Sequence, residues 1–243
     1  MSYHYVWLMW SNAFLLPWIA LYLSTPLMRP VMWRASLGTA LLGLTEPLFV
    51  PEYWDPPGLF HLAQRTGFDI ESVIFTFAIG GVGAVFYNAL TRTHLAPLAR
   101  GQTSQTLHRF HWIALLLPYA TFVPLVFLPW NPIYPGIVAL LIGSATSVLC
   151  RPHLAKKTLI GGALFLGLYA VFMVGLTWLA PGYVAQVWNL PALSGVLLYG
   201  IPLEELLFGT AFGMYWGGVY EHFTRTESVV HVQTPIGVAR QAQ

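Results

Sequence analysis

Two adjacent glutamates, Glu204 and Glu205, follow Pro202 in an otherwise apolar part of the chain, and Glu71 has a similar setting. An apolar environment without a nearby cation disfavours the charged form of a carboxyl, so the group keeps a proton at neutral pH and can act as an acid. Proline followed by acids is also ordinary chemistry at a helix N-terminus, where carboxylates satisfy free N–H groups. The apolar run 193–200 favours instead a helix that continues through a kink at Pro202. We predict that Glu204, Glu205 and Glu71 are the catalytic carboxyls of a proton-transfer site.

Aromatic residues lie on the same two stretches as these glutamates. At helical spacing such rings usually serve packing, but beside a proton donor their faces stabilise a carbocation by cation–π attraction. An acid with aromatic walls in a dry cavity is equipped to protonate an alkene. Glu46, which precedes Pro47, is either a third carboxyl lining that site or a residue at a membrane interface. The predicted substrate-binding residues are Phe75, Phe208, Phe212, Tyr215, Trp216 and Glu46.

The composition indicates which elements position these residues. Only 8% of the 243 residues are charged and 56% are hydrophobic, whereas soluble domains carry about 25% charged residues. This deficit excludes most soluble enzymes and nucleic-acid binders, because their surfaces need charge. A helix needs about 20 apolar residues to cross a bilayer core of about 30 Å. Seven stretches qualify, at residues 5–23, 31–50, 70–90, 112–130, 132–150, 158–180 and 201–223.

The basic residues predict the orientation of these segments, since Lys and Arg are retained on the cytoplasmic side of a membrane. With the N-terminus outside and the C-terminus inside, every basic residue except Arg65 lies at the cytoplasmic face, and the long outer loops are about 51–69 and 181–200. The cytoplasmic set is Arg29, Arg34, Arg92, Arg100, Arg109, Arg151, Lys156, Lys157, Arg225 and Arg240. Glu221 and His222 approach the same face, where we expect them to be solvated.

An internal repeat relates residues 68–93 to residues 201–226 at a shift of 133, with eight of 26 aligned positions identical, Glu71 and Glu204 among them. Gly43-Leu44-Thr45 recurs as Gly175-Leu176-Thr177, and Arg29-Pro30 recurs as Arg151-Pro152, in the same order. The shared order indicates duplication. Parallel repeats place equivalent residues at equal depth around a central interface, so we expect Glu71 and Glu204 to face each other.

The predicted fold is therefore an all-α polytopic membrane protein in which two parallel three-helix repeats flank a linking helix. Its parts are a first repeat at 1–110, the linking helix at 111–131, a second repeat at 132–226 and a cytoplasmic tail at 227–243. His108 and His111 are better explained by interfacial placement than by metal binding. Gly80-Gly81-Val82-Gly83 has no βαβ context that would make it a dinucleotide loop. We expect neither a metal nor a cofactor.

The chain resembles the membrane-integral lycopene cyclases of bacteria, archaea and fungi, which occur as two small subunits or one fused chain. The resemblance rests on the repeat, on Pro202-Leu203-Glu204-Glu205 as a Pro-x-Glu-Glu/Asp motif, and on Pro51-Glu52-Tyr53-Trp54-Asp55-Pro56-Pro57 as an aromatic, proline-rich outer loop. In the first repeat, Asp69-Ile70-Glu71-Ser72 departs from the motif and only Glu71 carries over. The resemblance implies cyclisation of lycopene, or of a related acyclic carotenoid, to β-rings without redox chemistry.

The implied protein is a multi-pass enzyme of the cell membrane whose substrate is a carotenoid within the bilayer. The expected partners are lipid, a second copy of the chain or other carotenoid enzymes, and no nucleic acid. The main alternative is a small-molecule transporter or facilitator built from parallel three-helix repeats. A retinal-binding photoreceptor is disfavoured because Lys156 and Lys157 are predicted to lie in a loop, which leaves no intramembrane amine for a Schiff base.

Overall fold

The computed structural model describes residues 3–97 and 110–230. The protein is mostly helical, and four of its helices are long and apolar enough to cross a membrane: Val6–Ser24, Ile70–Thr91, Ile133–Cys150 and Pro152–Leu179. Arg100, Arg109 and Arg240, used above to predict orientation, lie outside the described residues, as does the tail beyond residue 230.

The described part of the chain before residue 98 contains three predicted spans, and each holds helix. Its elements are α1 (Val6–Ala13), α2 (Leu15–Ser24), the 3-10 helix η1 (Pro26–Met28), α3 (Arg29–Ala40), the 3-10 helix η2 (Leu41–Leu48), η3 (Leu59–His61), α4 (Leu62–Thr66), α5 (Ile70–Thr91) and β1 (Thr93–Pro97). The predicted span 31–50 is thus α-helical only to Ala40, and η2 continues it with Pro47 inside.

Residues 110–230 supply the remaining elements, and the helix predicted for residues 193–200 is not among them. They form α6 (His111–Leu125), α7 (Ile133–Cys150), η6 (Pro152–Leu154), α8 (Ala155–Leu179), α9 (Tyr183–Val187), η7 (Leu190–Ala192), β2 (Leu197–Leu198), β3 (Ile201–Pro202), α10 (Leu203–Thr224) and β4 (Thr226–Val230). The run 193–200 is not a helix that kinks at Pro202. It enters a short hairpin of β2 and β3, and Pro202 is the N-cap of α10. Gly195 and Gly200 have positive φ angles there, which break a helix.

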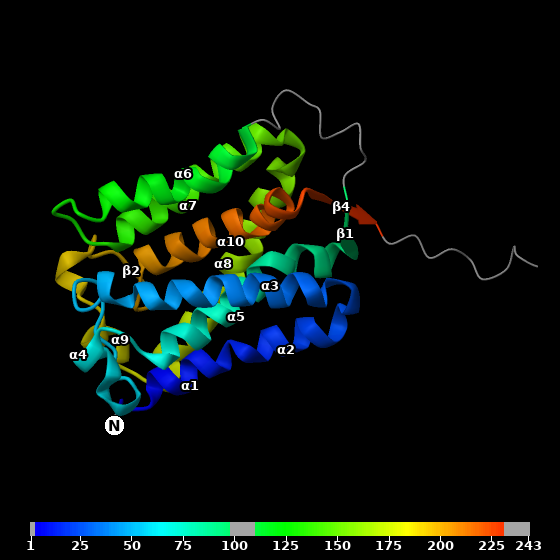
Figure 1. Ribbon diagram of the computed structural model, residues 1–243. Helices are drawn as coiled ribbons and strands as arrows, with labels where there is room; N and C mark the ends of the chain where they lie inside the picture. Colours follow the sequence, from blue (N-terminus) through cyan, green and yellow to red (C-terminus); the bar gives the residue numbers. More distant parts are fainter. Residues whose placement is uncertain (1–2, 98–109, 231–243) are drawn as a thin grey trace, which may run out of the picture.

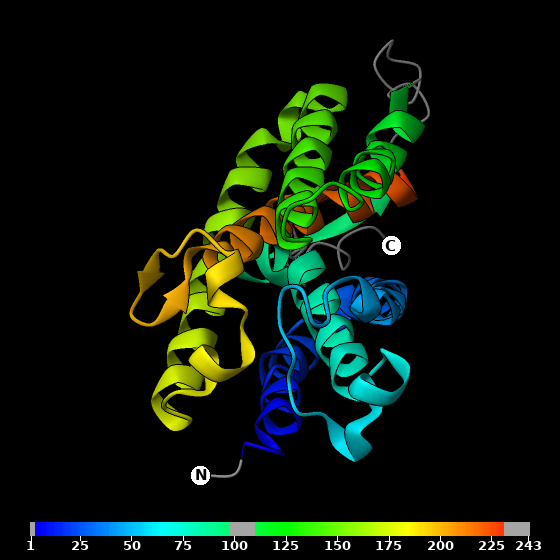
Figure 2. The same cartoon turned by 90° about the vertical axis from the view of Figure 1, so that its left-hand side faces the viewer.

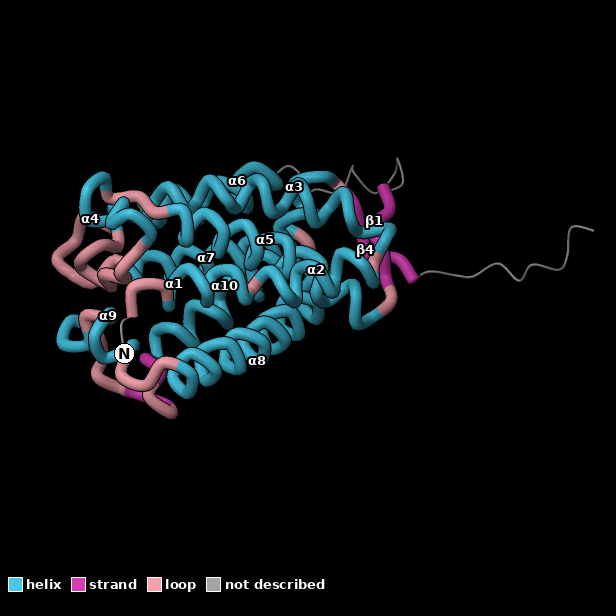
Figure 3. The backbone as a smooth tube through the Cα atoms, turned by 90° about the horizontal axis from the view of Figure 1, so that it is seen from below, coloured by secondary structure: helices cyan, strands magenta, loops and turns pink. Residues whose placement is uncertain are grey.

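The helices lie lengthwise in a bundle whose two ends differ (Figures 1 and 3). One end carries the N-terminal residues and the connections at 49–69 and 180–202, which we call the loop end. The other carries β1 and β4, which we call the strand end. Helices α1 to α5 and helices α6 to α10 occupy largely separate regions when the bundle is viewed from its loop end (Figure 2).

Helices α5 and α10 hold corresponding places in these two regions. Helix α5 packs against α3 and against α1 and α2, α10 packs against α8 and α7, and α5 and α10 contact each other. Glycine permits a close backbone approach in each region. A Cβ at Gly43 would lie 2.7 Å from the Val73 Cα in α5, and a Cβ at Gly213 of α10 would lie 2.6 Å from the Gly161 carbonyl oxygen in α8.

The two regions also meet at both ends of the bundle. At the strand end, β1 and β4 pair antiparallel with Leu95 opposite Ser228, a separation of 133 residues. The helices before them end at Arg92 and Arg225, both left-handed with φ of 54°. At the loop end, Trp54 forms an antiparallel bridge with Trp188. The pairing of β4 also shows that residues 227–230, predicted as tail, are part of the fold.

The expectation that Glu221 and His222 are solvated was wrong, as was the placement of Lys156 and Lys157 in a loop, because both lysines lie in α8. Lys157 lies in α8, where its Nζ is 2.7 Å from Oε1 of Glu221 in α10 and 2.8 Å from Oδ1 of Asn88 in α5. All three are buried, and His222 is fully buried. A buried charge needs a partner. Hydropathy does not show this pair, because its members lie far apart in the chain.

Candidate active site in an apolar cavity

A cavity of about 490 Å³ lies between the two regions of the bundle. Its walls come from η2 and α5 on one side and from α6, α7, α8 and α10 on the other, and they are almost entirely apolar. The structure brings the five predicted aromatic residues together in these walls: Phe75, Phe208, Phe212, Tyr215 and Trp216. Among the described residues, the carboxyl side chains that line it are Glu46 and Glu205.

Glu205 is held in a cage of hydrogen-bond donors. Its Oε1 accepts from the Tyr53 hydroxyl and, at 2.7 Å, from Nε1 of Trp188, and its Oε2 accepts from the Tyr169 hydroxyl at 2.5 Å. All four side chains are buried. Burial, followed by the nearby Glu205 charge, raises the pKa of Tyr53 well above its ordinary value, so the phenol stays a neutral donor.

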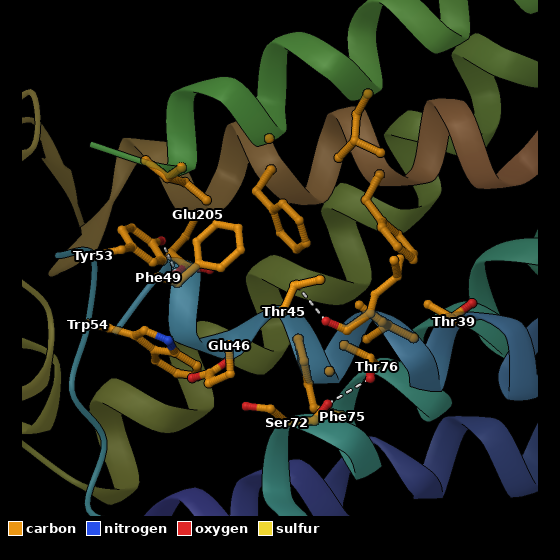
Figure 4. Close-up of a pocket in the computed structure, with 18 of the residues that line it drawn as sticks. Thr39, Thr45, Glu46, Phe49, Tyr53, Trp54, Ser72, Phe75, Thr76 and Glu205 are labelled. Carbon is orange, nitrogen blue, oxygen red and sulfur yellow. Dashed lines mark hydrogen bonds between the residues drawn. The ribbon is translucent and has the colours of Figure 1, made fainter. Parts of the chain in front are cut away.

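Glu46 lines the same cavity from η2 and has few polar neighbours. It is buried, and the Trp54 indole and the Ser72 hydroxyl lie beside it (Figure 4). Its Oε1 is buried without a hydrogen-bond partner among the described residues. The 3-10 helix carries this side chain inward, so Glu46 is a cavity residue rather than an interfacial one.

Glu204 and Glu71 do not line the cavity, and the structure does not place them face to face. Oε1 of Glu204 accepts from the Ser194 backbone N–H and the Tyr134 hydroxyl, both at 2.8 Å. Oε1 of Glu71 accepts from the Leu59 backbone N–H at 2.7 Å. Each therefore holds the connection that precedes its own helix. Successive helical residues point about 100° apart, which is why Glu205 reaches the cavity and Glu204 does not.

Sequence reasoning missed the groups that surround the two cavity carboxyls. Tyr53 and Trp54 lie in the aromatic, proline-rich loop 51–57, which carried a signal, but their contacts could not be inferred from it. Tyr169 and Trp188 reach Glu205 from elements 36 and 17 residues away in sequence. An apolar stretch contains many such aromatic residues, and nothing in its pattern singles out these two.

No group of three or more His, Cys, Asp or Glu side chains is arranged to hold a metal ion in the part of the chain that the structure describes. The cavity holds two carboxyls among aromatic rings, and carboxyls are groups that can give and accept protons. Ring faces and a dry interior suit a cationic intermediate formed from an apolar substrate.

The long apolar helices suggest a membrane protein, and its cavity holds two buried carboxyls among aromatic side chains. Residues 131–223 match the family model of lycopene cyclase. The match runs from just before α7 to the end of α10 and so includes Glu204 and Glu205. It supports a lycopene cyclase family and carotenoid cyclisation as the general activity, and it gives no support to a transporter. No curated protein and no solved structure matches the chain.

Proposed function

We propose that the protein cyclises an acyclic end of lycopene, or of a related polyene, to a β-ring without net oxidation or reduction. The observation that carries this proposal is that aromatic walls surround two carboxyls in one and the same apolar cavity. The family match over residues 131–223 agrees with it. A volume of about 490 Å³ falls within the ~300–1,000 Å³ typical of small-molecule sites. Such a cavity suits one end group of a long polyene, with the remainder in lipid.

The chemistry needs one acid and one base. Protonation of C2 in the terminal C1=C2 double bond gives a tertiary cation at C1. The C5=C6 double bond attacks C1, which closes the ring and moves the charge to C5. Loss of a proton from C6 then leaves the ring double bond. Aromatic faces lower the energy of the cationic species, and Phe75, Phe208 and Phe212 are placed in the cavity wall to do so.

The substrate enters sideways from the bilayer. Leu48 at the end of η2 and Tyr119 and Val123 of α6 line the cavity and are also exposed on the surface of the bundle. Between them, the rings of Phe49 and Phe122 stack with centroids 6.3 Å apart. A cavity that opens among exposed apolar side chains meets hydrocarbon once the helices lie in a membrane, so the polyene need not pass through water.

The membrane arrangement is part of the proposal: seven spans in two parallel repeats around α6, with the N-terminus outside. Three features support the repeat. The antiparallel pairing of β1 and β4 is centred on Leu95 and Ser228, which are 133 residues apart. The left-handed residues Arg92 and Arg225 have the same separation, and the bridged Trp54 and Trp188 are 134 residues apart. The distribution of Lys and Arg supports the orientation.

Among the predicted catalytic carboxyls, the cavity favours Glu205, with Glu46 as its companion. The catalytic roles of Glu204 and Glu71 stay predictions, and their contacts favour a positioning role in which each holds a connection at the loop end.

Expression in cells that accumulate lycopene tests the proposal. We expect chromatography of the extracted pigments to show β-ring products with the wild type and almost no β-ring product with Glu205→Gln. The matched control is Glu52→Gln, the same substitution at an exposed carboxyl of the loop end, and it should cyclise normally. Unchanged lycopene from wild-type protein that is abundant in the membrane would overturn the proposal.

A further inference from the structure

We infer that the two cavity carboxyls have opposite roles: Glu46 delivers the proton that starts cyclisation, and Glu205 receives the proton that ends it. This division rests on the proposed function and adds to it the direction in which the proton moves. It follows from the different surroundings of the two side chains.

The surroundings of Glu205 suit an acceptor. Two hydroxyls and one indole N–H point at its two oxygens. The Trp188 indole can only donate, and a carboxylate accepts several donors at once, whereas a carboxylic acid gives up part of that capacity to its own proton. Hydrogen bonds to the charged form stabilise that form. Of the two cavity carboxyls, Glu205 is therefore the one whose charged form gains hydrogen-bond donors, and it is the better proton acceptor.

The surroundings of Glu46 suit a donor. Its Oε1 has no hydrogen-bond partner among the described residues, and the described residues that line the cavity include no Lys, Arg or His. The charge that acts on Glu46 is that of another acid, Asp69. Asp69 caps α5 by accepting the Ser72 backbone N–H. Burial, the larger effect, raises the pKa of Asp69, whereas this bond lowers it. Two neighbouring acids do not both ionise readily, and Asp69 has the backbone donor that favours its charged form, so we assign the proton to Glu46.

One short segment places the two carboxyls around the same substrate. Tyr53 and Trp54 are consecutive, and Tyr53 donates to Glu205 whereas Trp54 lies beside Glu46. Figure 4 shows Glu205 reaching the cavity from α10 and Glu46 reaching it from η2, with Phe49 near both. An end group in this space meets one carboxyl from each region of the bundle.

The proton balance of the reaction closes with these two groups. The Glu46 O–H bond breaks as its proton forms a C–H bond at C2, which leaves Glu46 as a carboxylate. After C1–C6 bond formation, the C6–H bond breaks, its electron pair becomes the C5=C6 double bond, and the proton passes to Glu205. Glu205 then releases that proton to water and Glu46 takes one up from water, which restores the starting state, so substrate and product have the same composition.

The two roles predict different failures, which pigment analysis in lycopene-accumulating cells distinguishes. Glu46→Gln removes the only proton donor of the pair, so we expect lycopene to stay acyclic, with cyclised product reduced about 100-fold or more. Glu205→Gln still permits protonation and ring closure. Its cation must then lose a proton elsewhere or capture water, and we expect a small yield of rings with a displaced double bond or a hydroxyl group.

Glu46→Asp supplies a second test if the Gln variant does not accumulate in membranes. It keeps a carboxyl in place, so we expect slower cyclisation with the wild-type ring. Normal cyclisation by Glu46→Gln, altered rings from either Glu46 variant, or acyclic pigment alone from stably folded Glu205→Gln would overturn the assignment of roles. Failure of the wild type to cyclise would instead overturn the proposed function itself.

Discussion

Helices α5 and α10 are built alike and differ in the residues that could do chemistry. Each begins after a long connection at the loop end, holds that connection through a glutamate, and ends at a left-handed arginine before a strand. One position beyond that glutamate, α5 has Ser72 and α10 has Glu205. At the strand end, Asn88 of α5 and Glu221 of α10 both bind Lys157. At the cavity and at the strand end, α10 therefore carries an acid where α5 carries a neutral polar residue.

This difference shows that the residues that hold the loops are not the residues that face the cavity. The glutamates that match across the repeat, Glu71 and Glu204, hold loops, whereas a carboxyl without an acidic counterpart, Glu205, faces the cavity. The first region supplies its cavity carboxyl from another element, Glu46 of η2. The cavity is consequently asymmetric, with three donors around Glu205 on one side and, on the other, Glu46, whose Oε1 has no hydrogen-bond partner among the described residues.

The largest effect should come from making α10 resemble α5 at the cavity. Glu205→Ser copies Ser72 and removes the group that accepts the ring proton, so we expect β-ring product to fall by about 100-fold or more. Quantitative chromatography of pigments from lycopene-accumulating cells checks this. The matched control is Ser228→Ala at the strand end, which should keep most activity because it lies far from the cavity. Retention of wild-type rings by Glu205→Ser would contradict the comparison.

The buried ion pair at the strand end should show the next largest effect, on stability. Lys157→Met leaves Glu221 buried and uncompensated, which we expect to lower the free energy of unfolding by about 3–5 kcal/mol. Thermal unfolding of the purified protein in detergent measures this. Adding Glu221→Gln makes the second region resemble Asn88 in the first and should recover a large part of the loss. Equal instability of the single and double variants would show that the charge is not the cause.

Glu204 and Glu71 should respond alike to the same substitution. Gln keeps a carbonyl oxygen that accepts the Ser194 or Leu59 N–H, so we expect each variant to lose about 1 kcal/mol of stability. The rate of cyclisation should then fall by less than about threefold, which corresponds to a change in the activation barrier of less than about 1 kcal/mol. If Glu204→Gln removes the β-ring product as Glu205→Gln is expected to do, Glu204 acts on the substrate and the loop-holding role is insufficient.

The smallest effects should come from Arg92→Gly and Arg225→Gly. Both arginines are exposed and have φ of 54°, a conformation that costs about 1 kcal/mol for a residue other than glycine. Each variant should therefore be unchanged or more stable by up to about 1 kcal/mol. Unfolding in detergent checks whether the two changes match. A loss of more than about 1 kcal/mol in only one variant would show that the two helix ends are not equivalent.

The sequence predicted the helices well where apolar length decides the structure. The expected spans 70–90, 132–150 and 158–180 differ from α5, α7 and α8 by at most a few residues. It failed at residues 193–200, where hydropathy favours a helix but two glycines adopt positive φ angles. Local pattern does not reveal such turns inside an apolar run, because composition there is the same for strand and helix.

The sequence predicted which types of residue form the candidate site, but it did not predict how they are arranged. Acidic and aromatic residues on α5 and α10 were sufficient to predict acid–base chemistry, and the five aromatic residues do line the cavity. Which glutamate faces the cavity depends on helix phase, and the cage around Glu205 depends on side chains from a distant loop and from α8. Such long-range contacts are set by tertiary packing, which a single sequence does not display.

Deuterium labelling tests most directly whether a carboxyl that exchanges with solvent protonates the substrate. Membranes that contain the wild-type protein would be incubated with lycopene in D₂O, and the pigments analysed by mass spectrometry. Because an exchangeable carboxyl delivers the proton to C2, the account predicts one deuterium per ring formed and none in unreacted lycopene. Rings that form without deuterium, or lycopene that stays unchanged beside abundant protein, would contradict it.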